Sequence, residues 1–214
     1  MKMFKLCCLS LIILLAGCQS AGEASKSSYI LIDISGTYFK QLKKCTQAAK
    51  FALIKSQTND FIAVAKISSR SFSNEEVIIK GTLPSRPSQA NSMKTMMASK
   101  IDTFAKHARP SNHTDISGAI YQAAQTLGAQ PSLTKNIVIF SDMVEDLNVD
   151  TIRGRMPDLT GIHVIATNVI KLRSDNRNPE KYFKRLKQWE ELTLGAGAAS
   201  WKVVDDPMQL ADYL

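Results

Sequence analysis

Histidine and cysteine are scarce in this sequence, and several common catalytic motifs are missing. The three histidines stand far apart, at positions 107, 113 and 163, so no His/Cys cluster is available for zinc. Three of the four cysteines fall within the first 18 residues. The sequence contains no P-loop, no Gly-x-Ser-x-Gly motif and no zinc-hydrolase motif. These absences argue against P-loop nucleotide hydrolysis, serine-hydrolase chemistry and zinc-dependent hydrolysis.

The N-terminus has an apolar run that is too short to span a membrane. This run, residues 6–17, follows Lys2 and Lys5 and ends in small residues before Cys18. Charge, apolar length, small residues and cysteine come in the order that resembles the lipobox of bacterial lipoproteins. The resemblance implies a signal peptide at 1–17, cleavage before Cys18 and acylation of Cys18, for example with palmitate. Because Gln19 rather than Asp follows, it also implies the outer membrane, facing the periplasm, if the source is Gram-negative. Two or three acyl chains would make a stable anchor.

The rest of the chain predicts a single globular domain behind a short tether. Residues 18–27 are small and polar, as in a flexible linker, and residues 28–214 are long enough for one α/β domain. The whole sequence is 44% hydrophobic and 21% charged, which is ordinary for a soluble protein. Removal of residues 1–17 leaves Cys45 as the sole unmodified thiol, so no internal disulfide is expected. Cys45 falls on the apolar stripe of a predicted helix, and we expect it in the core.

Strand-like and helical patterns alternate along the predicted domain. We expect strands at 28–35, 60–68, 75–83, 136–142, 161–169 and 200–206. We expect a Pro/Ser loop at 83–90, and helices at 38–56, 93–108, 116–128, 179–198 and 207–214. Such alternation predicts an α/β fold, a three-layer, doubly wound, Rossmann-like sheet that is mostly parallel. The turn between the second and third strands favours a hairpin, and hence one antiparallel edge strand.

Oxygen-bearing side chains follow the ends of the predicted central strands. Asp33, Ser35 and Thr37 follow the first strand, Asp142 follows the fourth, and Thr114 stands before a helix. In a doubly wound sheet, ligands bind beyond the carboxyl ends of the strands, where the strand order reverses. We therefore expect two carboxylates and three hydroxyls to converge there. This set suits a hard divalent cation, Mg²⁺, with Mn²⁺ or Ca²⁺ as alternatives.

The same positions resemble the von Willebrand factor type A (vWA) domain with its metal-ion-dependent adhesion site. The first motif is Asp33-x-Ser35-x-Thr37, the second is Thr114 in "TDISGAI", and the third is Asp142 after "IVIFS". Their order agrees with that family over residues 28–214. The resemblance implies that Ser35, Thr37 and Thr114 contact the metal directly, while Asp33 and Asp142 act largely through water. It also implies an open metal position that a carboxylate from a protein partner fills.

Three details of the motifs bear on the shape of the site. Thr37 replaces the family's more usual Ser and keeps the hydroxyl. Gly36 fits a sharp loop that brings Ser35 and Thr37 to the same side. Met143 stands where many members have Gly, so we expect the rim of the site to differ.

Other interpretations of these residues are open at this point. The "DISGT" stretch distantly resembles haloacid dehalogenase phosphatases, but Ser35 stands where their second carboxylate acts, so we expect no enzyme. The strand-end residues could also be helix and turn caps on a vWA scaffold without metal dependence. The basic stretch at 171–187 lacks a nucleic-acid motif and is interpreted as a solvated helix face. The formal charge of +8 favours an acidic protein partner or an anionic lipid surface. The resulting hypothesis is a lipid-anchored envelope protein that binds a protein partner through a divalent metal.

Overall fold

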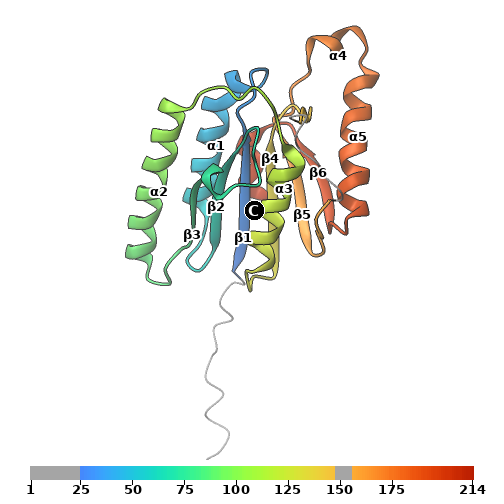
Figure 1. The fold of residues 1–214 in the computed structure, drawn as a ribbon. Coiled ribbons are helices and arrows are strands. Elements are labelled where there is room, and N and C mark those ends of the chain that lie inside the picture. The colour runs from blue at the N-terminus through green and yellow to red at the C-terminus, as the bar shows by residue number, and fades with distance from the viewer. Residues whose placement is uncertain (1–24, 148–155) are drawn as a thin grey trace, which may run out of the picture.

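The structure, a computed structural model, describes residues 25–147 and 156–214, and its centre is a six-stranded sheet (Figure 1). The strands are β1 (Lys26–Asp33), β2 (Phe61–Ile67), β3 (Val77–Thr82), β4 (Thr134–Phe140), β5 (Ile162–Thr167) and β6 (Ser200–Val204). The α-helices are α1 (Leu42–Lys55), α2 (Pro87–His107), α3 (Ile116–Gly128), α4 (Arg173–Arg177) and α5 (Glu180–Gly195). Short 3₁₀ helices are η1 (Phe39–Gln41), η2 (Asn74–Glu76) and η3 (Pro207–Asp212).

The strand order is β3-β2-β1-β4-β5-β6, and every neighbouring pair is parallel except β2 and β3. The predicted mostly parallel sheet with one antiparallel edge strand is therefore confirmed. The chain winds from β1 to β2 and β3 on one side, and from β4 to β5 and β6 on the other. The strand order thus reverses between β1 and β4, so a ligand site is expected beyond the carboxyl ends of these two strands.

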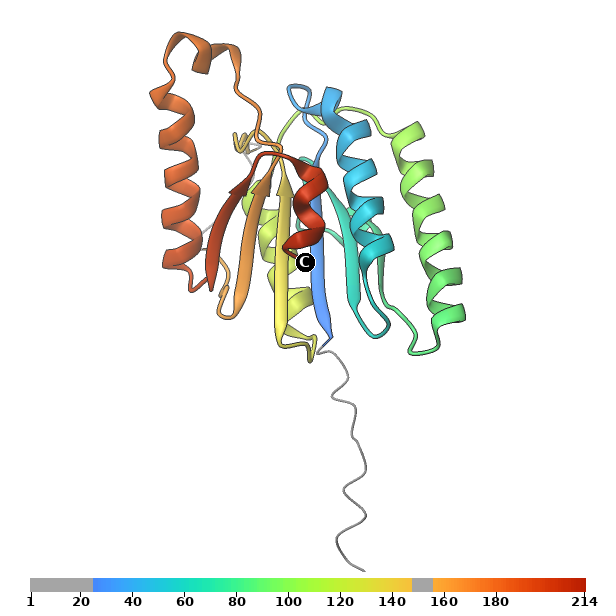
Figure 2. The ribbon, with the colours of Figure 1, turned by 180° about the vertical axis from the view of Figure 1, so that it is seen from behind.

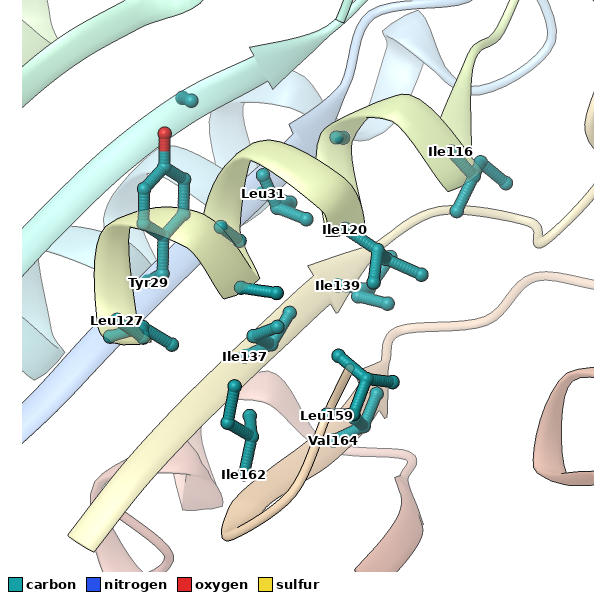
Figure 3. Packing of buried hydrophobic residues seen from close by; sticks show 14 of the residues in the cluster. Tyr29, Leu31, Ile116, Ile120, Leu127, Ile137, Ile139, Leu159, Ile162 and Val164 are labelled. Carbon is teal, nitrogen blue, oxygen red and sulfur yellow. The ribbon is translucent and has the colours of Figure 1, made fainter. Parts of the chain in front are cut away.

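Alternate residues of the central strands pack into two separate cores. Tyr29 and Leu31 of β1 join Ile137 and Ile139 of β4 under α3 (Figure 3). Trp189 of α5 belongs to the same core. The intervening residues of β1 and β4 pack against α1, α2 and η3, on the face seen in Figure 2. Because both faces are covered, every residue of β1 after Lys26 is buried. This explains the continuous apolar run, and each fully buried Ile or Leu contributes roughly 1.5–3 kcal/mol.

Several element boundaries differ from those predicted. The expected loop at 83–90 is wrong from Pro87 onward, because Pro87 occupies the first turn of α2, where a missing amide hydrogen is tolerated. The helix expected at 207–214 is the short 3₁₀ helix η3, in which the Asp206 carboxylate accepts a bond from the Met208 amide. The five-residue helix α4 was not predicted. β1 begins at Lys26, two residues earlier than expected.

Two sequence predictions concern cysteines. Cys45 lies in the core with no exposed surface, as expected, and burial raises the pKa of its thiol to about 12. Cys18, the proposed lipidation position, and the signal peptide at 1–17 lie outside the described residues, so both stay predictions. No helix in the described part of the chain combines the length and the apolar character that a membrane crossing needs.

Candidate metal centre

The first strand-end loop is organised around Asp33, the last residue of β1. Its side chain has no exposed surface. One carboxylate oxygen, Oδ1, accepts a hydrogen bond from the Ser35 amide at 2.7 Å, and Oδ2 accepts one from the Ser141 hydroxyl at 2.6 Å. Both oxygens are therefore held in fixed directions, and the second bond ties the end of β1 to the residue that follows β4.

The turn after Asp33 places two hydroxyls side by side. The Ser35 carbonyl accepts bonds from the Tyr38 and Phe39 amides at 3.1 and 2.8 Å, which closes the turn. Ser35 Oγ and Thr37 Oγ1 are 3.3 Å apart, so the two side chains lie on the same side, as expected. Glycine is not what permits this turn. Gly36 does not have a left-handed φ, and a Cβ added to it would meet open space.

The third motif joins the first through Asp142, which is 1% exposed. Its Oδ2 accepts a hydrogen bond from Thr37 Oγ1 at 2.8 Å, and its Oδ1 accepts one from the Val144 amide at 2.9 Å. Met143 between them has a φ of 62°, in the left-handed region that non-glycine residues rarely adopt. The buried Met143 side chain packs into the core, and its carbonyl accepts a bond from Trp189 Nε1 at 2.9 Å. The conformation common for Gly is thus kept here by packing against α5.

The second motif reaches the site through its backbone. Thr114 exchanges two backbone hydrogen bonds with Asp146, at 2.8 and 3.0 Å, which places it against the third loop. Asp115 caps α3 by accepting a bond from the Gly118 amide at 2.9 Å. Just before them, the Ser111 amide donates to the carbonyl of the first loop's Ile34 at 2.8 Å. The loop that carries Thr114 therefore contacts both of the others. Side-chain hydrogen bonds, however, link only the other four predicted residues.

The electrostatics of the two buried carboxylates favour a cation. Burial raises the pKa of Asp33 to about 6; hydrogen bonds from Ser141 and Ser35 oppose the rise, and the nearby Asp142 charge adds to it. Within the described residues, neither Asp33 nor Asp142 forms an ion pair with a lysine, arginine or histidine. Two carboxylates out of water are costly without a positive partner.

The donor set fits a hard divalent cation. Oxygen ligands, one or two carboxylates and retained waters are what Mg²⁺ prefers. The described residues contain no group of three or more His, Cys, Asp or Glu side chains placed to hold a metal. A metal here would therefore depend on the hydroxyls of Ser35, Thr37 and Thr114 as well as the carboxylates.

Two residues of this region were not named by the sequence predictions. Ser141 bridges the loops, since its hydroxyl also accepts a bond from the Met143 amide at 2.9 Å. Glu145 accepts bonds from the Ser117 amide and hydroxyl at 2.7 and 2.6 Å, which ties the third loop to the first turn of α3. The signal for Ser141 was its place beside Asp142 at a buried strand end. No local pattern marked Glu145.

Comparisons with known proteins identify the fold. No family model matches the sequence, and no curated protein matches it significantly. Among solved structures, the pilus adhesin SpaC from Lactobacillus rhamnosus GG has a TM-score of 0.54 and 14% identity, over 90% of this chain and 29% of that chain. The PilB minor pilin from Streptococcus sanguinis has a TM-score of 0.53 and 13% identity, over 89% of this chain and 59% of that chain.

A von Willebrand factor type A protein from Catenulispora acidiphila matches at 13% identity and a TM-score of 0.49, over 89% of this chain and 41% of that chain. The chain therefore spans less than two thirds of each of these proteins. At such identities the likenesses show the fold alone. Together with the observed strand order, the likenesses to SpaC and PilB establish a doubly wound, mostly parallel α/β fold, which is vWA-like.

Proposed function

We propose that this chain is a lipid-anchored module that binds a protein partner through a divalent metal at the strand-end site. Ser35, Thr37 and Thr114 would contact the metal directly, and Asp33 and Asp142 would hold it largely through water. The metal would be Mg²⁺ in the first instance, with Mn²⁺ or Ca²⁺ as alternatives. The observation that carries the proposal is the pair of buried carboxylates, Asp33 and Asp142, which accept hydrogen bonds from hydroxyl groups of the strand-end loops. Within the described residues, neither carboxylate forms an ion pair with a cationic side chain.

The ligand types define what the site can do. A metal held largely by neutral hydroxyl oxygens keeps a strong attraction for an anion, so it would offer a binding position for a carboxylate of the partner. Ser35 and Thr37 stand side by side on the loop, and Thr37 is exposed. The role of the chain is to hold these oxygens in place, with Asp33 fixed by two bonds and Asp142 by two more.

The same geometry supports binding rather than phosphoryl transfer. Attack by Asp33 would need an accessible carboxylate oxygen, yet both of its oxygens accept hydrogen bonds and the side chain has no exposed surface. Ser35 occupies the place where a second carboxylate would move protons. A steady phosphatase turnover with Mg²⁺ that disappears in Asp33→Asn would contradict this assignment.

The proposed location is the cell envelope, with Cys18 acylated in the outer membrane and the domain facing the periplasm. It is supported by the lipobox-like N-terminus and by the fold shared with a pilus adhesin and a minor pilin. Labelling with a radioactive or alkyne-bearing fatty acid tests it directly. Label should enter the wild-type protein and be absent from Cys18→Ala. Equal label in both would contradict the anchor and leave the metal site untouched.

Metal binding is tested on the full chain in detergent by thermal unfolding. Melting curves are recorded in EDTA and, separately, in Mg²⁺, Mn²⁺ or Ca²⁺. The wild type should melt at a higher temperature with metal than in EDTA. A metal present at 100 times its Kd stabilises by about 2.7 kcal/mol. Asp142→Asn should lose this rise. The matched control is Asp60→Asn, which changes a buried carboxylate that accepts amide bonds from Lys26 and Gln57 just before β2, at the opposite end of the sheet. Melting curves that no metal moves would refute the site.

Partner binding is tested with the same proteins immobilised. Envelope extract is passed over the wild type in Mg²⁺ and in EDTA, and over Asp142→Asn in Mg²⁺. A partner that uses the metal should be retained in the first case alone. Equal recovery in all three would contradict metal-dependent binding while leaving the fold intact.

A further inference from the structure

The helices α1 and α2, which cover part of one face of the sheet, carry mostly positive charge. α1 and α2 lie side by side there (Figures 1 and 2). Together with η1 they contain eight lysines and a single acidic residue, Asp102. On the opposite face, α3 has no charged residue, and α5 has four basic and three acidic residues. The lysines of the first face are Lys40, Lys43, Lys44, Lys50, Lys55, Lys94, Lys100 and Lys106.

Part of this face is hollowed into a groove of about 610 Å³ between η1, α1 and α2, which we call the lysine groove. Lys40, Lys43, Lys50 and Lys106 line it, with Asp102 among them. Lys50 Nζ lies 2.5 Å from Asp102 Oδ1, so the acidic residue of the groove is already paired. The other three lysines form no ion pair within the described residues, and all three are exposed.

The lysine groove begins at the candidate metal centre. Phe39 lines the groove, and its amide donates to the carbonyl of Ser35 at 2.8 Å. Lys40 follows Thr37 by three residues along the same turn. Phe39 and Lys40 therefore place one end of the groove next to the first loop in the chain.

We propose that the lysine groove binds an acidic segment of the protein partner whose terminal or adjacent carboxylate reaches the strand-end metal. The metal contact rests on the proposed function, whereas the lysine contact needs no metal. Without a cation, Asp33 and Asp142 repel an acidic partner. The lysines oppose that repulsion and raise the local concentration of acidic chains, an effect that salt screens beyond a Debye length of about 8 Å.

The geometry favours a protein segment over a lipid surface. The positive residues line a recess between two helices, which an extended chain can enter and a flat bilayer cannot. The recess also leads toward the carboxyl ends of the strands, through η1. The chain enters the domain at Lys26, at the other end of β1, where a tether to the membrane would attach (Figure 1).

The test uses fluorescein-labelled poly-L-glutamate of about 20 residues and the full chain in detergent, with fluorescence anisotropy in EDTA and low salt. The triple variant K40E/K43E/K106E should bind at least about tenfold more weakly than the wild type. Each charge reversal removes a favourable contact that raises the affinity severalfold, and it adds a repulsion between glutamates. Because these side chains are exposed, the variant should melt like the wild type. Binding by the wild type should also weaken steeply as NaCl is raised.

A second triple variant, K181E/K184E/K187E on α5, carries the same change in net charge away from the groove. It should lose no more than about twofold. An equal loss in both variants would show attraction to net charge alone and would overturn the groove, as would unchanged binding by the groove variant.

Two further arms separate this inference from the metal proposal and from lipid binding. Added Mg²⁺ should tighten binding to the wild type and not to Asp142→Asn. If Mg²⁺ has no effect but the groove variant still loses binding, the metal proposal fails and the lysine contact stands. Vesicles with 30% phosphatidylglycerol should distinguish the wild type from the groove variant less than the peptide does. Groove-dependent binding of vesicles without binding of poly-glutamate would overturn the assignment to a protein segment.

Discussion

Ser141→Ala should weaken both the fold and the candidate metal centre, because one hydroxyl serves two buried partners. Ser141 Oγ donates to Asp33 Oδ2 at 2.6 Å and accepts from the Met143 amide at 2.9 Å. Ser141 and Asp33 have no exposed surface, and Met143 is 1% exposed. The alanine variant therefore leaves a buried carboxylate oxygen and a buried amide without these bonds, and bulk water has no ready access to either.

The size of the effect follows from these two orphaned groups. A buried donor or acceptor left unsatisfied costs about 1–3 kcal/mol, and more when it is charged. Partial relaxation of the loops reduces the sum, so we expect a loss of about 3 kcal/mol in the free energy of unfolding. For a domain of this size that corresponds to roughly 6–12 °C in Tm. Metal affinity should fall about 10- to 100-fold, as is usual when a residue that orients a ligand is lost.

Urea unfolding of the full chain in EDTA measures the free energy of unfolding. A separate titration of the folded, EDTA-free chain with Mg²⁺ measures the metal affinity. Ser56→Ala is the matched control for the same chemical change. The Ser56 hydroxyl donates at 3.0 Å to the Ala52 carbonyl, which also accepts a bond from the Ser56 amide, so no acceptor is left without a partner. We expect the control to lose at most about 1 kcal/mol.

The reasoning is refuted if the two serine variants unfold within about 1 kcal/mol of each other and bind Mg²⁺ equally well. That result would mean that Asp33 is oriented by the Ser35 amide alone. A large loss of stability with unchanged metal affinity would have a different meaning. It would separate the packing of the loops from ligand orientation and contradict the second half of the prediction.

Three further changes test separate parts of the molecule. Thr114→Val should abolish the metal-induced rise in Tm yet change the Tm in EDTA little, because Thr114 is held to Asp146 by backbone bonds; a retained rise would remove Thr114 from the ligand set. Met143→Gly should relieve about 1 kcal/mol of backbone strain but lose about 2–4 kcal/mol of stabilisation from the buried side chain, so urea unfolding should show a net destabilisation. A more stable variant would show that the strain dominates. Asp175→Asn should cost about 3 kcal/mol at pH 7, because the buried Asp175 carboxylate is 2.7 Å from Arg185. Arg185 holds the pKa of Asp175 below its usual range. The difference in Tm between the wild type and Asp175→Asn should therefore shrink at acid pH, as the wild-type carboxyl is protonated.

The sequence predicted those parts of the fold that local patterns encode. α3 begins and ends where expected, at Ile116 and Gly128, because Asp115 caps it and an apolar face runs through it. The mostly parallel pairing of the strands was also predictable, since apolar runs separated by crossover helices favour it. α4 was not predicted, and η3 was predicted as a longer helix, because five or six residues are too few to show a helical period.

The interior of the candidate site was less predictable, because its bonds join distant parts of the chain. The Ser141–Asp33 bond spans 108 residues and the Thr37–Asp142 bond spans 105. Motif order indicated that these loops meet but not which atoms do. Likewise, the lysines were visible in the sequence, whereas their groove depends on how α1 and α2 pack. Gly36 shows the opposite error, since its identity predicted a need for glycine that the backbone does not have.

The register of β1 against β4 connects the stability of the fold to the competence of the site. Ile32 pairs with Phe140, so Asp33 and Ser141 follow as direct neighbours at the two strand ends. A shift of two residues would keep each side chain on its own face of the sheet and yet separate the carboxylate from its hydroxyl. The bonds of Asp33 therefore favour the observed register, while the two uncompensated carboxylates oppose it. A divalent cation would remove that opposition and keep the bonds, so metal binding should stabilise the centre of the sheet and prepare the anion-binding position in the same step.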